Sequence, residues 1–165
     1  MKPQLEQQYL KDLFNYDSDT GIFTWKVKRK GTRGVGSQAG YKEKTGYITI
    51  RIDGINYAAH RLAWAYEHGY WPSLDLDHID CNRSNNRLSN LREATRSQNT
   101  CNTKISSNNT SGIKGVMWHK RNKKWCATIM LNQKAKWLGY FDNIEEAQHA
   151  VEAARSELHG EFARS

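Results

Sequence analysis

The chain has 165 residues, of which 38% are hydrophobic, and its mean hydropathy is −0.85. No run approaches the roughly 18 apolar residues of a membrane helix, so we expect no membrane partner. Three cysteines without a CxxC pair argue against structural zinc and favour a cytoplasmic location. The net charge of +8 favours a nucleic-acid partner, because lysines and arginines that neutralise phosphates release counterions. A generally basic soluble protein is the alternative on charge alone.

Residues 1–59 are predicted to form a β-rich basic extension. A strand over 22–27 (IFTWKV) follows a turn-forming stretch, and 26–44 is a loop with seven basic residues and one acid. We expect this loop to lie along a phosphate backbone; its candidate DNA-binding residues are Lys28, Arg29, Lys30 and Arg33. YITIRI and INYAAH, joined by Asp53-Gly54, form the strongest hairpin signal in the chain.

Residues 60–104 are predicted to form the central domain. A helix is expected from about 59 to 68, ended by Gly69. Strands follow over 74–79 and 90–94, separated by a loop rich in asparagine. Thr95 and Gln98 then form a T-x-x-Q capping box that opens a short helix through about residue 103. The predicted unit is strand, loop, strand, helix.

This unit resembles the HNH endonucleases, whose core is the ββα-metal motif. The pattern D-H-I-D-x-N-x-x-N-N-R-x-x-N-L-R-x-x-T carries the resemblance, with H-R-L-A-W at 60–64 and YDSDTGIFTW at 16–25. It is similar to the phage and intron homing-type branch. By the resemblance, His78 is the first H, Asn90 the middle N, and Asn99 occupies the third position. Asn in that position favours a harder cation than zinc or nickel.

Phosphodiester cleavage needs an activated water and neutralisation of the charge that develops on the phosphate. We expect His78 and Asn90 to be the catalytic residues: a neutral histidine is a competent base, and Asn90 can tie the loop backbone and fix the histidine's orientation. Asp77 and Asn99 are the expected metal ligands, with Mg²⁺ favoured and Mn²⁺ able to substitute, because Mg²⁺ prefers few oxygen ligands. Adjacent residues of a regular strand point to opposite faces, so a shared site requires a strand that is distorted or ends at His78.

Simpler interpretations remain open for these residues. His78 could be a surface histidine in a salt-bridged loop, and Asn90 a plain turn or cap residue. Asn102 lies one helical turn from Asn99 and is an alternative ligand. His60 could pack beneath the site, approach DNA or be a satisfied core histidine.

Residues 105–112 are predicted to be a linker, and 113–165 a small domain of three strands and one helix. Asn143 and Glu146 offer a capping box, and an apolar stripe at helical spacing follows. From residue 112 to 141 there are seven Lys or Arg and no acid, so we expect the sheet face opposite the helix to be basic.

The segment 111–163 resembles the AP2 DNA-binding domain through S-G-I-K-G-V-M-W, K-W-C-A-T-I, W-L-G-Y-F-D and H-G-E-F-A. The resemblance places Trp137 against DNA and Thr128 and Met130 on the exposed face. This chain has Met117, His119 and Met130 where plant-type domains have arginines, which puts base readout by arginine in doubt. The expected phosphate contacts are Lys114, Lys120, Arg121, Lys123, Lys124, Lys134 and Lys136.

The sequence therefore predicts an α+β protein: a ββα-metal HNH nuclease core with N-terminal β-hairpins, plus an AP2-like domain with a three-stranded antiparallel sheet packed on one helix. The expected function is metal-dependent, site-specific hydrolysis of duplex DNA by a homing-type enzyme, acting as a monomer on DNA and nicking one strand. The alternative is a non-catalytic DNA-binding regulator with a degenerate HNH core. An RNA-binding protein fits the charge but lacks RRM and KH signatures.

Overall fold

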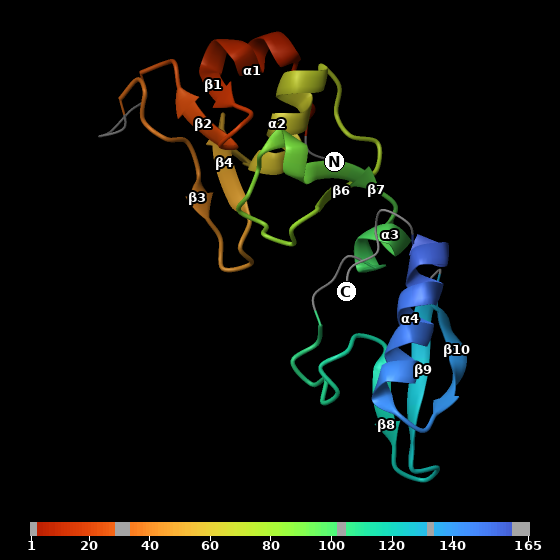
Figure 1. The fold of residues 1–165 in the computed structure, drawn as a ribbon. Coiled ribbons are helices and arrows are strands. Elements are labelled where there is room, and N and C mark those ends of the chain that lie inside the picture. Colours follow the sequence, from red (N-terminus) through yellow and green to blue (C-terminus); the bar gives the residue numbers. More distant parts are fainter. Residues whose placement is uncertain (1–2, 29–33, 102–104, 132–133, 160–165) are drawn as a thin grey trace. The chain divides into compact units, whose positions relative to one another are not determined.

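The protein is described by a computed structural model that covers residues 3–28, 34–101, 105–131 and 134–159 (Figure 1). Its chain divides into two compact units, Met1–Ala94 and Thr95–Ser165. We expected a boundary between residues 59 and 60, but a strand there leads directly into a helix and both pack into one core. Among the described residues, no helix is long and apolar enough to cross a membrane.

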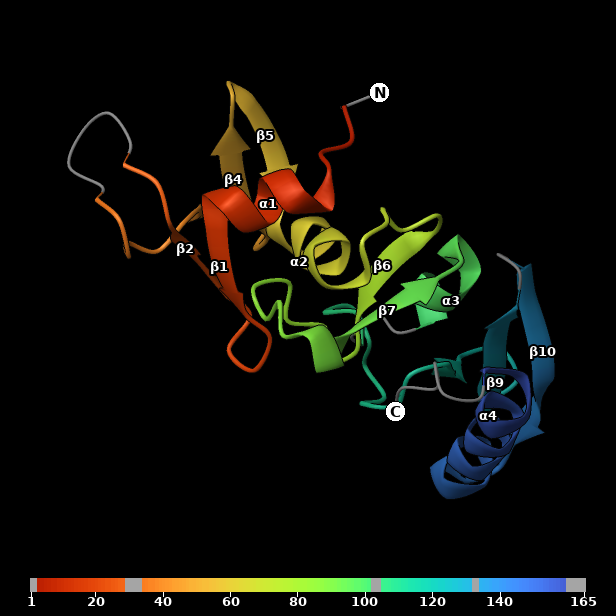
Figure 2. The same cartoon turned by 90° about the horizontal axis from the view of Figure 1, so that it is seen from above.

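The first unit combines small antiparallel sheets with two helices (Figure 2). α1 (Gln7–Leu13) leads into the hairpin β1 (Phe14–Asp17) and β2 (Ile22–Trp25), which sequence reasoning predicted only in its second strand. A three-stranded sheet of β3 (Tyr41–Lys42), β4 (Ile48–Ile52) and β5 (Ile55–Ala58) follows. α2 (Ala59–His68), the strand pair β6 (Asp75–His78) and β7 (Leu91–Ala94), and the short 3₁₀ helix η1 (Leu88–Asn90) complete it.

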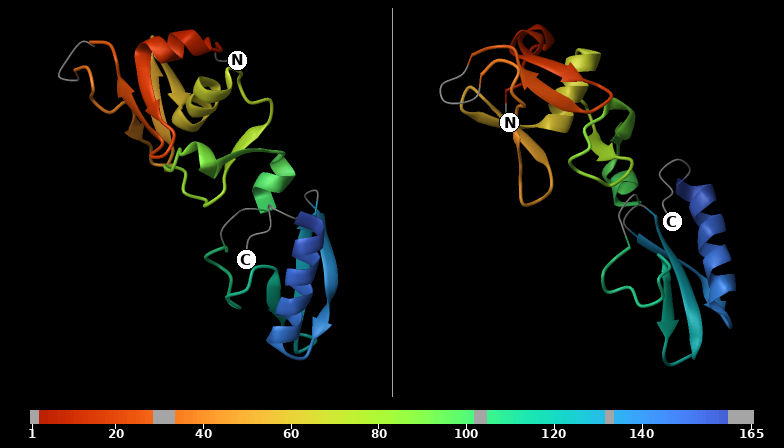
Figure 3. Two further views of the ribbon diagram at one scale, coloured as in Figure 1. Left: turned by 45° about the horizontal axis from the view of Figure 1, so that its top comes forward. Right: turned by 60° about the vertical axis from the view of Figure 1, so that its left-hand side comes forward.

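The second unit begins with α3 (Arg96–Cys101) and continues with a three-stranded antiparallel sheet. Its strands are β8 (Val116–His119), β9 (Lys124–Leu131) and β10 (Lys134–Phe141), with β9 in the centre. α4 (Ile144–His159) lies along one face of this sheet (Figure 3). Val116 and Ala127 on that face pack against Ala147 and Val151 of the helix, which forms a small separate core.

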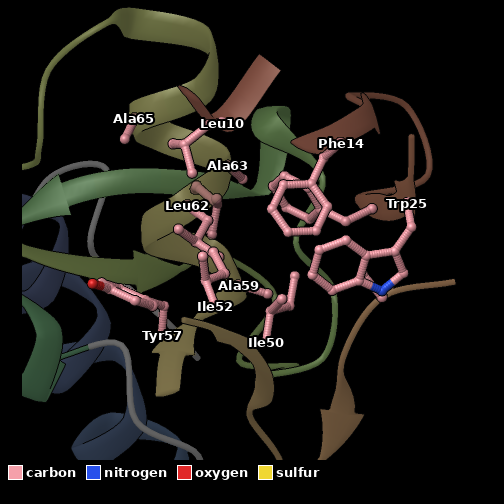
Figure 4. Packing of buried hydrophobic residues seen from close by; sticks show 13 residues of the cluster. Leu10, Phe14, Trp25, Ile50, Ile52, Tyr57, Ala59, Leu62, Ala63 and Ala65 are labelled. Atoms are coloured by element: carbon pink, nitrogen blue, oxygen red, sulfur yellow. The ribbon is translucent and has the colours of Figure 1, made fainter. Parts of the chain in front are cut away.

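The larger core lies in the first unit, where α1, α2 and the β4–β5 hairpin meet (Figure 4). Leu10, Phe14, Ile50 and Leu62 are fully buried, and the ring centroids of Phe14 and Trp25 lie 4.3 Å apart. The apolar stripe of α2 faces inward, as an amphipathic helix requires. Because this core contacts Leu91 at the start of β7, it fixes one strand of the β6–β7 pair.

Several local predictions are confirmed. The β4–β5 turn has positive φ at both Asp53 and Gly54, the geometry that a two-residue hairpin turn requires. The Thr95–Gln98 capping box forms: the Thr95 amide donates to Gln98 Oε1 at 2.8 Å, and the Gln98 amide donates to Thr95 Oγ1 at 3.3 Å. The Asn143 side chain caps α4 in the same sense, accepting from the Glu146 amide at 2.8 Å. The sequence also predicts that Gly160 ends α4, and this residue lies outside the described part of the chain.

The register of the second sheet corrects one expectation. Trp137 pairs with Thr128, whereas Lys136 pairs with Ile129, whose side chain is buried on the helix side. Side chains alternate along a strand, so Lys136 and Trp137 project from opposite faces of β10. Trp137, Thr128 and Met130 therefore lie on the face opposite α4, and Lys136 does not contribute to that face.

Candidate active site

The strand pair β6–β7 and the loop that joins them form the candidate site. The two strands are antiparallel, with Asp77 opposite Arg92 and His78 opposite Leu91. Regular pairing ends at His78, and the loop over 79–90 continues from there. Cys81 in this loop has a φ of 58°, which marks a sharp change in chain direction.

Hydrogen bonds of its own polar side chains hold this loop. The Asp80 carboxylate accepts from the Asn82 amide at 2.7 Å, from Asn85 Nδ2 at 2.7 Å and from Asn90 Nδ2 at 3.0 Å. Burial alone would raise the pKa of Asp80, but these hydrogen bonds outweigh it and lower the pKa. Asparagines that would be unfavourable in a helix therefore fix the loop by bonding its backbone and its carboxylate.

Asn90 closes this loop at its C-terminal end. Its Oδ1 accepts from the Asp80 amide at 3.0 Å, and its Nδ2 also donates to the Asn85 carbonyl at 2.8 Å. Its own carbonyl accepts from the Ile79 amide at 2.9 Å. These bonds join the two ends of the loop directly after His78.

His78 is buried, with 4% of its surface exposed. Its Nε2 lies 3.2 Å from Oδ1 of Asn86, and its ring centroid lies 5.0 Å from that of His60 and 5.9 Å from that of Tyr47. Burial lowers the pKa of His78, although the Asn86 hydrogen bond and the nearby Asp80 oppose this effect. The imidazole is therefore neutral near pH 7, the form in which it can accept a proton.

Asp77 lies in a different environment from its neighbour. Its Oδ2 accepts two hydrogen bonds from Arg92, from Nε at 3.0 Å and from Nη2 at 2.9 Å. The pair spans directly opposed residues of β6 and β7, and only 4% of Asp77 is exposed. Asp77 thus binds its cross-strand partner Arg92, whereas the His78 ring contacts Asn86, His60 and Tyr47.

The N-terminal elements support the loop from outside. The Tyr16 hydroxyl donates to the Asn86 carbonyl at 2.7 Å. Gly21 in the β1–β2 turn has a φ of 73°, and an added Cβ there would collide with the backbone of Asn86 and Arg87. Arg83 donates to the Thr45 carbonyl at 3.0 Å, and its guanidinium lies 4.9 Å from the Tyr47 ring centroid. The predicted N-terminal extension is therefore part of the site's framework.

Asn99 lies on α3, in the second unit, and its side chain is half-buried. Its amide donates to the Thr95 carbonyl at 2.9 Å as part of the first helical turn. Because Asp77 belongs to the first unit, an Asp77–Asn99 metal pair stays a prediction. The alternative ligand, Asn102, lies outside the described residues.

The donor set near His78 limits which metal could bind. Within the described part of the chain, no group of three or more His, Cys, Asp or Glu side chains could hold a metal ion. A structural zinc site needs four such ligands, so these residues do not fit one. They fit a hard cation such as Mg²⁺, which takes one or two protein carboxylates and completes its shell with phosphate and water.

Most of the candidate DNA-binding residues lie on the surface. Lys28 is exposed in the first unit, whereas Arg29, Lys30 and Arg33 lie outside the described residues. Of the candidates in the second unit, the exposed ones are Lys120, Arg121, Lys123, Lys134, Lys136 and Trp137. Lys114 is half-buried, and Lys124 pairs with Asp142 at 3.0 Å.

Sequence reasoning did not single out Asn86 or Tyr47, the residues that contact the His78 ring together with His60. His60 belongs to the H-R-L-A-W motif, but the sequence did not decide whether it packs beneath the site, approaches DNA or lies in the core. No spacing rule connects residues 78 and 86, because their contact depends on the path of an irregular loop. Tyr47 lies in the connection between β3 and β4, and only the tertiary fold brings it to His78.

Part of the chain matches a known protein family. The HNH endonuclease family model matches residues 57–101, which contain Asp77, His78, Asn90 and Asn99. Protein 3.8 of Escherichia phage T7 is 37% identical over 106 residues, which are 64% of this chain and 87% of that protein. Within residues 57–101 the chain is similar to the HNH endonucleases. The match to the phage protein covers 87% of that protein, so this similarity extends well beyond residues 57–101.

Two further similarities were found. An uncharacterised HNH endonuclease, L560, of Acanthamoeba polyphaga mimivirus is 34% identical over 125 residues, covering 74% of this chain and 64% of that protein. The solved structure of the HNH homing endonuclease I-HmuI superimposes with a TM-score of 0.46 and 23% identity. It covers 81% of this chain and 75% of I-HmuI.

Proposed function

We propose that this protein is a metal-dependent endonuclease that hydrolyses phosphodiester bonds in duplex DNA. The observation that carries the proposal is the buried His78 at the end of β6, in contact with Asn86 and within the segment that matches the HNH endonucleases. We further propose that it is a site-specific, homing-type enzyme that acts in the cytoplasm as a monomer and nicks one strand. A single HNH segment per chain supports nicking by a monomer.

In this reaction His78 accepts a proton from the attacking water. The new bond between water oxygen and phosphorus forms as the bond to the leaving oxygen breaks, and the leaving oxygen takes a proton from solvent. Asp77 and Asn99 are the proposed ligands of Mg²⁺, for which Mn²⁺ can substitute; the ion supplies charge neutralisation at the phosphate and the leaving oxygen. Asn90 keeps the loop closed behind His78, because its side chain bonds both Asp80 and Asn85.

The second unit is proposed to hold the enzyme on DNA as an AP2-like module. Trp137, Thr128 and Met130 share the sheet face opposite α4, and 59% of Trp137 is exposed. Lysines of the β8–β9 turn, and those of the edge strand β10 that project from the other face of that strand, would contact phosphates, which position a protein without specifying sequence.

One observation favours a second candidate, a DNA-binding regulator with an inactive core. Arg92 already neutralises the Asp77 carboxylate, and a cation would have to compete with this guanidinium for Oδ2. In that case the second unit binds DNA and the first has no hydrolytic role.

A plasmid assay separates the two candidates. Purified protein is incubated with supercoiled DNA in Mg²⁺, Mn²⁺ or EDTA, beside the variants His78→Ala and His149→Ala. His149 is an exposed histidine of α4 and serves as the matched control. We expect open-circle product from wild type and His149→Ala with metal, and none from His78→Ala or in EDTA.

Binding by all three proteins is measured in parallel by gel shift. Loss of cleavage without loss of binding in His78→Ala supports its role as base. Binding without cleavage by wild type, also on genomic DNA of the phage or host that encodes the protein, would instead establish the regulator. Linear product would contradict nicking by a monomer.

A further inference from the structure

Asn86 is the polar side chain that meets the ring of His78. Its Oδ1 lies 3.2 Å from His78 Nε2, and the Asn86 residue is only 2% exposed. The side-chain bonds described for Asn90 go instead to Asp80 and Asn85. The sequence predicted that Asn90 orients His78. In the structure Asn90 closes the loop, and the side chain of Asn86 contacts the histidine.

We propose that Asn86 is a positioning residue that sets which nitrogen of His78 acts as the base. An amide oxygen can only accept, so it binds an imidazole nitrogen that carries hydrogen. With the hydrogen on Nε2, the lone pair of the neutral ring is on Nδ1, and Nδ1 takes the proton of the attacking water. This inference rests on the proposed nuclease function.

Two contacts hold Asn86 in place. Its carbonyl accepts from the Tyr16 hydroxyl at 2.7 Å, and Gly21 lies directly against its backbone. Burial raises the pKa of Tyr16, so its hydroxyl stays protonated and remains a donor. Because both residues belong to the β1–β2 hairpin, that hairpin fixes the position of Oδ1 relative to β6.

Two aromatic rings restrain the plane of His78. The His60 ring centroid lies 5.0 Å away with the planes at 70°, and the Tyr47 centroid lies 5.9 Å away at 54°. Arg83 packs over the Tyr47 ring and thereby holds it toward the site. A half-turn of the imidazole about its Cβ–Cγ bond would place Cε1 instead of Nε2 beside Asn86 and must displace these neighbours, so the Asn86 hydrogen bond to Nε2 selects one stable tautomer.

The first measurement is the tautomer of His78 in the full chain, by two-dimensional ¹H–¹⁵N NMR of the imidazole nitrogens at pH 7.5. Its signals are assigned by their loss in His78→Gln. We expect a pyrrole-type Nε2 and a pyridine-type Nδ1 in wild type, and a mixture of tautomers in Asn86→Leu. Asn86→Asp keeps an oxygen acceptor and should restore the wild-type pattern.

Steady-state cleavage by the same variants is the second measurement. Asn86→Leu should lower kcat by about tenfold to a hundredfold, the range found when a group that orients a catalytic-site ligand is removed, with KM unchanged. Asn86→Asp should recover kcat. Asn82→Leu, an exposed asparagine of the same loop whose side chain bonds Ser84, is the matched control and should match wild type in both measurements.

A hydrogen on Nδ1 in wild type, or an unchanged tautomer in Asn86→Leu, would overturn the inference. So would an equal loss of kcat in Asn86→Asp and Asn86→Leu when both melt at the wild-type temperature. An inactive wild-type protein with its hydrogen on Nε2 would overturn the nuclease function but leave the tautomer assignment standing, so the two failures are distinguishable.

Discussion

The salt dependence of DNA binding tests the cations of the second unit quantitatively. Lys134 and Lys136 are exposed on the edge strand β10 and have been assigned to phosphates. Each neutralised phosphate of duplex DNA contributes a slope of about −0.9 to the plot of log Kobs against log salt concentration. The double variant Lys134→Gln/Lys136→Gln should therefore have a slope less negative than wild type by about 1.8.

Between 50 and 200 mM salt, a fourfold change, this slope difference corresponds to about a twelvefold smaller loss of affinity in the double variant. Fluorescence anisotropy with labelled duplex measures it. Lys11→Gln, a charge removal on α1 in the first unit, is the control and should leave the slope near that of wild type. Equal slopes for wild type and the double variant would refute the assignment of these lysines to phosphates.

Other predictions concern the framework of the site. Gly21→Ala should destabilise the fold by more than the roughly 1–2 kcal/mol of a left-handed non-glycine residue, because its Cβ also collides with the Asn86 backbone; chemical denaturation measures this. Gly54→Ala, with φ at 81° and open space around it, is the matched control, and an equal loss there would exclude the collision. Burial lowers the pKa of His60 to about 3, so the unfolded state binds the extra proton below pH 6.5 and stability falls as the pH is lowered toward 3. His60→Phe should make the free energy of unfolding fall less steeply, by at most about 1.4 kcal/mol per pH unit. Urea unfolding between pH 7 and pH 4.5 measures this. An unchanged pH profile would contradict the burial of a neutral His60.

Local signals in the sequence predicted much of the secondary structure. Asp53-Gly54 between alternating strands fixed the β4–β5 hairpin, and Thr95 with Gln98 fixed the start of α3, since each signal depends on residues within one turn. α1 was missed because its seven residues carry no capping side chain and its stability comes from the burial of Leu10. Short helices of this kind depend on tertiary packing, which no local pattern reports.

The strands that carry the candidate site were predictable from the sequence, but the contacts of its side chains were not. The spacing of the HNH motif indicated Asp77, His78 and Asn90, and β6 and β7 form at the expected places. The ring of His78 nevertheless contacts residues from the β6–β7 loop, the β3–β4 connection and α2, which are separate segments of the chain. Such contacts arise only when the core fixes all three segments. A sequence motif therefore indicates the chemistry of the site but not the tertiary contacts that position His78.

The Asp77–Arg92 pair requires a test that separates structure from catalysis. Both partners are largely buried, at 4% and 15% exposure, so Asp77→Asn alone should cost about 3 kcal/mol because the guanidinium loses the charged partner of this ion pair. Loss of cleavage in that variant would therefore not identify a metal ligand. The double variant Asp77→Asn/Arg92→Gln removes both charges and should recover most of the stability, measured by thermal melting and urea unfolding. If the stable double variant binds DNA but does not cleave it at any Mg²⁺ concentration, Asp77 acts in the chemistry; if cleavage returns with stability, Asp77 is a structural residue of the strand pair.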